Sequence, residues 1–149
     1  MVDIDVGIAD LKIAQTPDEL LARGIGSCIA IILYDPLLKI GALSHTLLPH
    51  QGDKQHERPA RFADTAIDHM LHQMIALGCK TQNIRAKIVG GSNMFPESGS
   101  HIGTENILSA REKLIKEGIR IDGEAVSGTV GRSIRFSTET GLVTVKMMF

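Results

Sequence analysis

The sequence predicts a single α/β domain of the α+β layered type, in which mostly antiparallel β-sheets pack against helices. Strand-like segments stand at both ends of the chain, and two stretches with helical spacing lie between them. No linker, internal repeat or low-complexity tract interrupts residues 1–149. A chain of this length fits one hydrophobic core, so we expect one domain over residues 1–149.

Strand patterns dominate the N-terminal third. A first strand is expected over residues 2–13, ending at the turn sequence Thr16-Pro17-Asp18. Residues 29–34 form a continuous apolar run typical of a strand covered on both faces, and residues 39–48 return as a second strand. The intervening Asp35-Pro36-Leu37-Leu38 predicts a four-residue loop, and hence an antiparallel hairpin.

Two helices are expected in the middle of the chain. The first begins near Pro59, carries an apolar stripe as far as Met74 and stops at Gly78. The second has Thr104 as its N-terminal cap and ends at Gly118. Its predicted inner face consists of Ile107, Leu108, the stem of Arg111, Leu114 and Ile115.

The remaining elements are a short strand and a C-terminal hairpin. The strand covers residues 86–89 and leads into the glycine turn "GGSNMF". In the tail, Ile134 and Phe136 precede "TETG", and Val143 and Val145 follow it. This alternation predicts a hairpin with one buried face.

Composition excludes several classes of protein. The net charge is −1, no basic run is present, and the chain has no Trp and one Tyr, which argues against nucleic acid or an anionic membrane as partner. The first eleven residues lack the basic start of a secretory signal, and no stretch has the length of a membrane span. We therefore expect a cytoplasmic protein whose Cys28 and Cys79 are free thiols.

Cys28 stands where the glycine turn "GIGSC" meets the buried strand. With the predicted hairpin loop, Tyr34 pairs with Lys39, and Cys28 then lies opposite His45. Directly opposed side chains have Cβ atoms roughly 4.5–5.5 Å apart, close enough for a thiol to reach an imidazole. The sequence thus suggests a cysteine nucleophile with a histidine base.

The glycines beside Cys28 suggest a second part of such a site. Gly24 and Gly26 permit positive φ and leave the backbone uncovered, so N–H groups of Ser27 or Cys28 are available to an oxyanion. Together these residues predict acyl transfer on an amide or ester. The alternative, that Cys28 is a small buried residue and His45 a core histidine, stays open from the pattern alone.

Six segments of the chain resemble one known family. They are "GIGSCIAIILYDP" followed by "KIGALSHTLLP", then "RFADTAI", "AKIVGGSNMF", "IGTEN" and "GRSIRFSTETGLVTVK". In this order they resemble the chemoreceptor glutamine deamidase family, CheD, over residues 20–146. The resemblance implies that Cys28 and His45 are the catalytic pair and that glutamine side chains of methyl-accepting chemotaxis receptors are hydrolysed to glutamate.

The resemblance has further implications. It implies a layered fold like the catalytic domain of the cytotoxic necrotizing toxins and the phosphatase CheC as a partner in many species. We expect no cofactor and no metal. The family often carries a threonine six residues before the cysteine, where this chain has Ala22. A backbone carbonyl near Ala22 is then expected to orient His45, with weakened rather than abolished catalysis.

Other readings of the sequence stay in view. Met94 and Phe95 of the "GGSNMF" turn are an apolar pair for docking of a receptor helix, unless they pack in the core. His69 and His72, with His50 or His56, are a weak candidate for a metal site. The alternatives to a deamidase are an adaptor that binds receptor or CheC without efficient chemistry, and a thiol hydrolase of receptor methyl esters.

Overall fold

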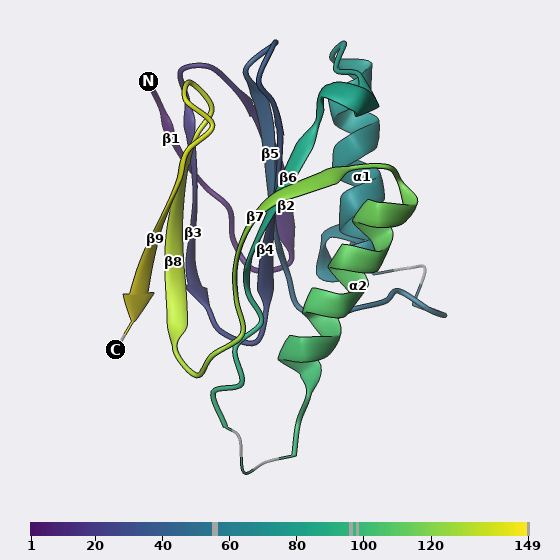
Figure 1. The fold of residues 1–149 in the computed structure, drawn as a ribbon, viewed down its shortest axis with the longest axis vertical. Helices are drawn as coiled ribbons and strands as arrows, with labels where there is room; N and C mark the ends of the chain where they lie inside the picture. Colours follow the sequence, from purple (N-terminus) through teal and green to yellow (C-terminus); the bar gives the residue numbers. More distant parts are fainter. Residues whose placement is uncertain (55–56, 96, 98, 149) are drawn as a thin grey trace.

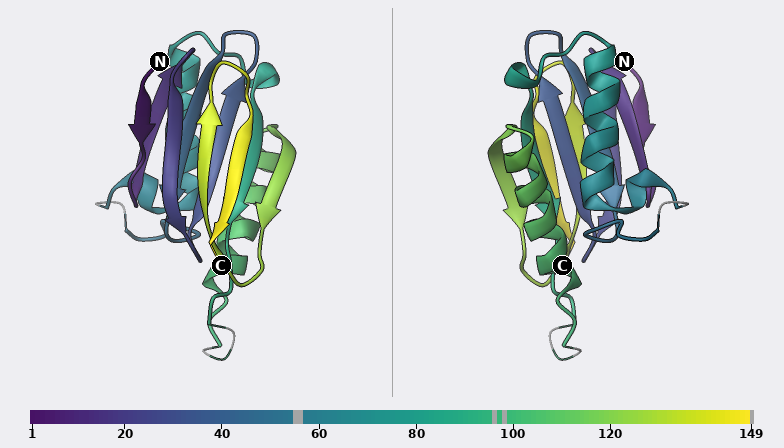
Figure 2. Two further views of the ribbon diagram at one scale, coloured as in Figure 1. Left: turned by 90° about the vertical axis from the view of Figure 1, so that its left-hand side faces the viewer. Right: turned by 90° about the vertical axis from the view of Figure 1, so that its right-hand side faces the viewer.

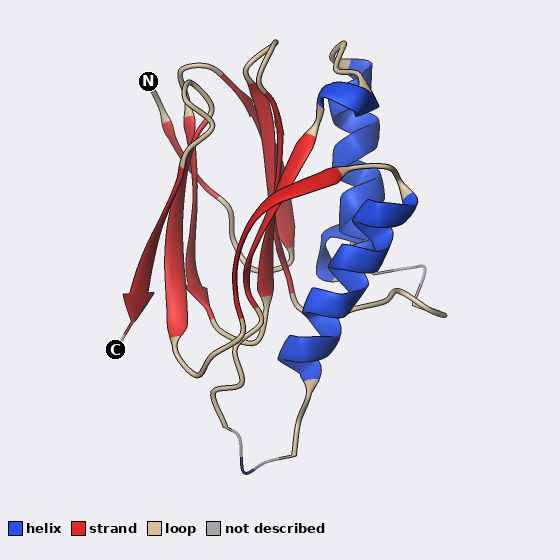
Figure 3. Cartoon of the chain, viewed as in Figure 1, coloured by secondary structure: helices blue, strands red, loops and turns tan. Residues whose placement is uncertain are grey.

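The computed structural model has three layers: a four-stranded sheet, a five-stranded sheet and a pair of helices (Figure 1). It describes residues 1–54, 57–95, 97 and 99–148. The two helices cover the outer face of the five-stranded sheet, whose other face lies against the four-stranded sheet (Figures 2 and 3). The predicted α+β layered class is therefore confirmed.

The strands and helices follow a simple order along the chain. The strands are β1 (Asp3–Asp5), β2 (Asp10–Gln15), β3 (Glu19–Ile25), β4 (Ile29–Asp35), β5 (Ile40–Thr46), β6 (Arg85–Gly90), β7 (Arg120–Val126), β8 (Gly131–Ser137) and β9 (Val143–Met148). The helices are α1 (Ala63–Ala76) and α2 (Ile102–Lys116), with short 3₁₀ turns η1 (Pro59–Arg61) and η2 (Thr81–Asn83).

Strand order places β4 in the middle of the five-stranded sheet. This sheet runs β2-β5-β4-β6-β7, and the smaller one runs β1-β3-β8-β9. Most pairings are antiparallel, whereas β1 pairs parallel with β3 and β6 pairs parallel with β7. A strand in this central position has neighbours on both edges and layers on both faces, which accounts for the uninterrupted apolar run predicted to be a buried strand.

The side chains of β4 divide between two hydrophobic cores. Ile29, Ile31 and Leu33 pack toward the helices, while Ala30 and Ile32 pack toward the four-stranded sheet. All five are at most 1% exposed. The even-numbered positions of β4 therefore face the space between the two sheets.

The predicted first strand is wrong in its extent. The chain turns at residues 7–9, where the Asp10 N–H donates to the Gly7 carbonyl and Ala9 has φ +60°. β1 and β2 consequently belong to different sheets. Two further strands, β3 and β7, were not predicted, because Arg23-Gly24 interrupts the apolar pattern of β3 and β7 buries only part of one face.

The helices were predicted in the right places with some wrong details. The apolar stripe of α1 is buried as expected, but the helix begins at Ala63, after η1. α2 begins at Ile102 with His101 as its N-cap, so Thr104 is not the cap. Leu108 and Ile115 are 55% and 72% exposed rather than on the inner face, which small and polar residues share instead.

The C-terminal hairpin is confirmed, whereas the register of the first hairpin is corrected. In the tail, Phe136 pairs with Val143 across β8 and β9. In the β4–β5 hairpin, Asp35 pairs with Ile40, because the Asp35 carboxylate accepts N–H bonds inside the turn and Lys39 adopts φ +54°. The loop is displaced by one residue, so every cross-strand partner is displaced by two.

Candidate active site

Cys28 lies in a bend between β3 and β4, at the end of the sandwich where the β6–α2 loop also emerges (Figure 1). Its side chain is half-buried and its thiol is free. Neighbouring donors hold the bend: Ser92 N–H donates to the Gly26 carbonyl at 2.9 Å, and Gly91 N–H donates to the Cys28 carbonyl at 2.8 Å. The thiol therefore sits on a backbone whose carbonyls are engaged.

The surroundings of Cys28 have opposing effects on the pKa of its thiol. Burial raises the pKa of the Cys28 thiol, and hydrogen bonds from the backbone of Gly26 and of Cys28 itself lower it in part. A bond that lowers a thiol pKa is one donated to the sulfur, so these are N–H groups. The net shift of the pKa is upward, which leaves a neutral thiol in the resting protein.

His45 lies near the end of β5 and is 1% exposed. It pairs with Ala30 on one side and Asp10 on the other. Burial lowers the pKa of His45, and the nearby backbone of Val6 opposes this shift only in part. Among the described residues neither ring nitrogen has a hydrogen-bond partner. The ring is thus a neutral, buried imidazole whose nearest polar influence is the Val6 backbone.

The corrected register separates Cys28 from the predicted position directly opposite His45. The residue opposite His45 is Ala30, and Cys28 comes just before the first paired residue of β4, Ile29, which lies opposite Thr46. A displacement of two residues keeps each side chain on its face. His45 lies two residues after Leu43 in β5 and therefore faces the space between the two sheets. Cys28 lies two residues before Ala30, which faces the same space.

The backbones of Ala22 and Gly26 differ from what the sequence predicted for them. Ala22 is 1% exposed and pairs with Ile134, and its carbonyl receives no hydrogen bond from His45. The backbone that acts on the imidazole is that of Val6, which the sequence pattern did not single out. Gly24 has φ +65°, as expected, whereas Gly26 does not have a positive φ; a Cβ there would lie 2.7 Å from Met94 Sδ, so the Met94 side chain would have to move.

The "GGSNMF" turn stands beside the Cys28 bend. Met94 and Phe95 are 43% and 74% exposed, so the expected exposed apolar pair is confirmed. The backbone N–H groups of Ser92 and Asn93 are not free, because they donate to Gly26 and Gly128. A hollow of about 110 Å³ is lined by Ser27, Ser92, Asn93, Met94, Phe95, Ser100, Ile102 and Gly103.

The size of this hollow indicates what it can hold. Ligand and cofactor pockets usually span about 300–1,000 Å³, so a hollow of about 110 Å³ suits a single side chain. A larger hollow of about 360 Å³, next to Tyr34 and Gly141, is lined by no residue of the Cys28 bend. We assign the candidate site to the smaller hollow because its lining includes Ser27, the residue directly before Cys28, whose thiol is the half-buried one of the described residues.

Two buried polar residues near this site were missed by sequence reasoning. Asn106 is 0% exposed and donates from Nδ2 to the carbonyls of Ser27 and Leu47. Arg132 is 5% exposed and donates to the Ser92 hydroxyl at 3.1 Å, while burial lowers the pKa of its guanidinium. Both belong to quoted motifs, "IGTEN" and "GRSIRF", but polarity alone did not reveal that they are buried.

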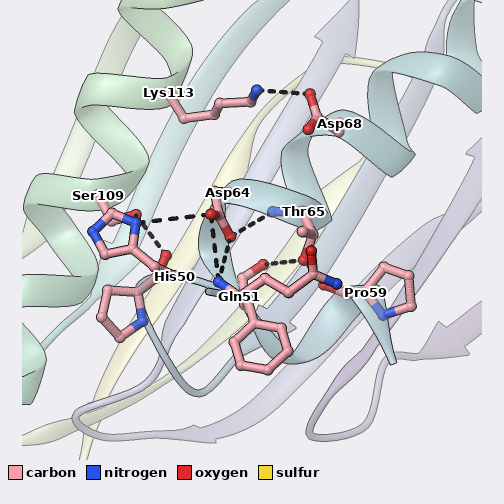
Figure 4. A network of polar contacts seen from close by, with 10 residues as sticks. His50, Gln51, Pro59, Asp64, Thr65, Asp68, Ser109 and Lys113 are labelled. Carbon is pink, nitrogen blue, oxygen red and sulfur yellow. Dashed lines mark hydrogen bonds and ion pairs between the residues drawn. The ribbon is translucent and has the colours of Figure 1, made fainter. Parts of the chain in front are cut away.

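A second polar cluster at the start of α1 combines a serine, a histidine and an aspartate (Figure 4). The Ser109 hydroxyl lies 3.3 Å from His50 Nδ1, and the same nitrogen lies 3.8 Å from Asp64 Oδ2. A hydrolytic triad uses the two different ring nitrogens for these contacts. Ser109 also donates to the Pro49 carbonyl at 2.6 Å, so the cluster anchors the loop after β5.

The described histidines that were considered for a metal do not form a group of three with other ligands. His69 and His72 line a shallow surface hollow with Asp68, and His56 lies outside the described residues. Within the described ranges, no three His, Cys, Asp or Glu side chains are placed to share a metal ion. The polar contacts of His50 are instead those shown in Figure 4.

Comparison with known proteins gives a consistent result. The CheD chemotactic sensory transduction family matches residues 47–147. The chain is 40% identical to a probable chemoreceptor glutamine deamidase CheD 2 of Geobacter metallireducens, over 97% of this chain and 93% of the relative. It is 33% identical to the chemoreceptor glutamine deamidase CheD of Thermotoga maritima, over 95% and 89%. No helix in the described part of the chain is long and apolar enough to cross a membrane.

Proposed function

The chain belongs to the CheD family, and from this premise we propose that it hydrolyses glutamine side-chain amides of chemoreceptors to glutamate. The names of the relatives support this substrate. The observation that carries the chemistry is the arrangement of Cys28, which stands in a hydrogen-bonded bend beside a side-chain-sized hollow, next in sequence to the strand that pairs with the His45 strand. The reaction supports adaptation of the chemotactic response.

The first half of the proposed reaction forms a thioester. His45 takes the proton of the Cys28 thiol as the sulfur attacks the amide carbon, and the carbonyl oxygen becomes an oxyanion. Backbone N–H groups of the bend, from Gly26, Ser27 or Cys28, stabilise that charge. When the C–N bond breaks, His45 returns the proton to the leaving nitrogen, and ammonia departs.

The second half restores the enzyme. A water molecule attacks the thioester carbon while His45 accepts one of its protons. The C–S bond breaks, the proton returns to the Cys28 sulfur, and glutamate leaves. The net change is one amide and one water converted to one carboxylic acid and one ammonia, and it needs no cofactor or metal.

The electrostatics support general-base activation rather than a resting ion pair. Burial raises the pKa of the Cys28 thiol and lowers the pKa of His45, so thiol and imidazole are both neutral near pH 7. A neutral imidazole is the form that accepts a proton. The charged pair then forms only as the thiol attacks, when the substrate shields the site from water.

The proposal also assigns partners and a compartment. Met94 and Phe95 form the contact for a receptor helix, because they are exposed apolar side chains on the rim of the hollow. CheC would compete at the same surface if it presents a similar helix. Two free cysteines among the described residues suit the reducing cytoplasm, where the signalling parts of receptors lie.

Mass spectrometry of a receptor cytoplasmic fragment tests the proposal. The fragment is incubated with the protein, with Cys28→Ala and with the matched control Cys79→Ala. We expect selected glutamines to gain the mass of deamidation with the wild type and Cys79→Ala, and none to do so with Cys28→Ala. Conversion by Cys28→Ala would contradict the assignment of the nucleophile.

A second function is favoured by one observation. Ala22 lacks the hydroxyl that the family often has there, and its carbonyl does not orient His45. An adaptor that binds receptor or CheC without efficient chemistry would show this loss. In the same experiment, binding of the fragment without any conversion would support the adaptor, and release of methanol from a methylated fragment would support an esterase.

A further inference from the structure

Asn106 connects the two chain segments that carry the proposed catalytic residues. It lies in α2 and is 0% exposed. Its Nδ2 donates to the Ser27 carbonyl at 2.9 Å and to the Leu47 carbonyl at 3.0 Å. Ser27 directly precedes Cys28, and Leu47 comes two residues after His45. One side-chain amide group thus holds the bend and the end of β5 together.

The orientation of this amide follows from its partners. Asn106 Oδ1 is buried and has no hydrogen-bond partner among the described residues. Turning the amide over would place Oδ1 against the two carbonyl oxygens and leave both without a donor. The NH₂ group therefore faces the Ser27 and Leu47 carbonyls, at the expense of one unpaired acceptor.

The bond to Ser27 controls the direction of the Cys28 N–H. The Ser27 carbonyl and the Cys28 N–H belong to one planar peptide group, which is trans. In a trans peptide the N–H points opposite to the C=O, so a donor that fixes one fixes the other. The Cys28 N–H is one of the two backbone groups that act on the Cys28 sulfur.

The neighbouring peptide groups are held differently. The Gly26 and Cys28 carbonyls accept main-chain N–H bonds from Ser92 and Gly91, which involve no side-chain donor. The Ser27 carbonyl accepts its bond from the side chain of Asn106. The orientation of the peptide group that carries the Cys28 N–H thus depends on the side chain of Asn106, whereas the neighbouring peptide groups are held by main-chain donors.

From these contacts we propose that Asn106 is a positioning residue, which aims the Cys28 N–H at the sulfur and the oxyanion and fixes the spacing of the Cys28 bend from the His45 strand. The inference rests on the proposed deamidase function. It gives a role to Asn106 of the "IGTEN" motif, which takes no part in the chemical steps of the proposed reaction. Asn106 touches neither the sulfur nor the substrate, so its effect passes through the backbone.

The test compares Asn106→Asp with Ser109→Ala in a Cys79→Ala background. Asn106→Asp keeps the shape but replaces the NH₂ donor, so at most one carbonyl keeps a bond, and only when the carboxyl is protonated. Ser109 is the matched control, because it is also buried on α2 and donates at 2.6 Å to the carbonyl of Pro49 in the same loop. The background leaves Cys28 as the single thiol.

Two readouts are needed. The first is kcat and KM for the receptor fragment, and the second is the pH profile of Cys28 alkylation by iodoacetamide. For Asn106→Asp we expect kcat to fall about 10- to 100-fold with little change in KM, as for a misplaced catalytic group. The alkylation profile should move to higher pH, because the Cys28 N–H no longer favours the thiolate. Ser109→Ala should leave both readouts unchanged.

The outcomes separate this inference from the proposed function. If the wild type converts no glutamine, the deamidase proposal fails, while the alkylation profile still reports whether Asn106 controls the thiol. If the wild type is active and Asn106→Asp keeps its kcat and profile, the inference is overturned. It is also overturned if Ser109→Ala reproduces both changes, since the role would then be general support of the loop.

A second variant serves if Asn106→Asp does not fold, as judged by its thermal unfolding. Asn106→Ser keeps one short donor and removes the unpaired acceptor, which relieves the cost of burying Oδ1. A folded Asn106→Ser protein with a lowered kcat and an alkylation profile shifted to higher pH supports the inference. A folded Asn106→Ser protein with wild-type values overturns it.

Discussion

Cys28 and Cys79 are the two thiols of the chain, and they lie in opposite kinds of surroundings. Cys28 precedes β4, whereas Cys79 is 4% exposed in the core under the helices, near Asp35 at the other end of β4. Burial raises the pKa of both. At Cys28 two backbone N–H groups oppose the rise, while at Cys79 the Asp35 carboxylate adds to it and the pKa reaches about 11.

The neighbours of a thiol decide its chemistry. Donors beside the sulfur stabilise a thiolate, and a carboxylate beside it repels one. The two residues are identical in type and both are largely screened from water. Of the two, Cys28 combines N–H groups that oppose the rise in pKa with a neighbouring hollow lined by Ser27, and on these two features rests the proposal that it is the nucleophile.

The largest expected effect comes from removing His45, the proposed base for the Cys28 thiol. His45→Gln keeps a hydrogen-bonding side chain but cannot take a proton, so kcat for glutamine conversion should fall about 10²- to 10⁴-fold. Steady-state kinetics with the receptor fragment measure this. A variant within a few-fold of wild type would mean that His45 is a core residue and that the comparison rests on Cys28 alone.

The same residue predicts a pH dependence of stability. The folded-state pKa of His45 is lowered below its unfolded value of about 6.5, so the unfolded chain binds the proton more tightly. The contribution of neutral His45 to the free energy of unfolding is complete above the unfolded-state pKa and is lost as the pH falls below that pKa. Denaturant unfolding from pH 7.5 to 5 should therefore show a decline in the free energy of unfolding, and His45→Gln should flatten that decline.

A second, smaller effect is expected at the rim of the Cys28 hollow. Phe95→Ser removes a 74% exposed aromatic ring and should weaken binding of the receptor fragment about tenfold or more, with the thermal midpoint unchanged. Leu142→Ser is a matched control, because Leu142 is 66% exposed beside the other, larger hollow. Titration calorimetry measures both. Equal losses for the two variants would argue against docking at Phe95.

The predictable parts of the fold are those with strong local patterns. The central strand β4, the stripe of α1 and the C-terminal hairpin follow from periodicity, and the structure confirms them. The extent of the first strand and the presence of β3 could not be read from the pattern. A turn at Gly7–Ala9 sends the chain to a second sheet, and such tertiary pairing leaves little trace in local hydrophobicity.

The residues of the candidate site could also be predicted only in part from the sequence. Cys28 and His45 are identifiable because few side chains can act as nucleophile or base. The predicted pairing of their strands was wrong by two residues, because the Asp35 side chain and the positive φ of Lys39 place the hairpin loop one position later in the chain. The contributions of Val6 and Asn106 come through backbone groups distant in sequence, which no local pattern reports.

A third effect tests whether the absence of a hydroxyl at Ala22 limits the proposed reaction at Cys28. Ala22→Thr should raise kcat by about two- to tenfold if the hydroxyl can orient His45. Because Ala22 is 1% exposed between the sheets, the larger side chain should also lower the free energy of unfolding by roughly 1–3 kcal/mol. Ala22→Val adds the same bulk without the hydroxyl. A gain shared by both variants, or absent from both, would count against the hydroxyl.

The smallest effect on activity is expected at the other thiol, Cys79. Cys79→Ala removes a sulfur from the core under the helices, so the free energy of unfolding should fall by about 1–2 kcal/mol. Loss of a thiol with a pKa of about 11 removes no thiolate at neutral pH, so kcat and KM should equal those of wild type. If activity fell while the unfolding midpoint held, Cys79 would have a part in the chemistry, and the contrast drawn from the neighbours of the two thiols would be wrong.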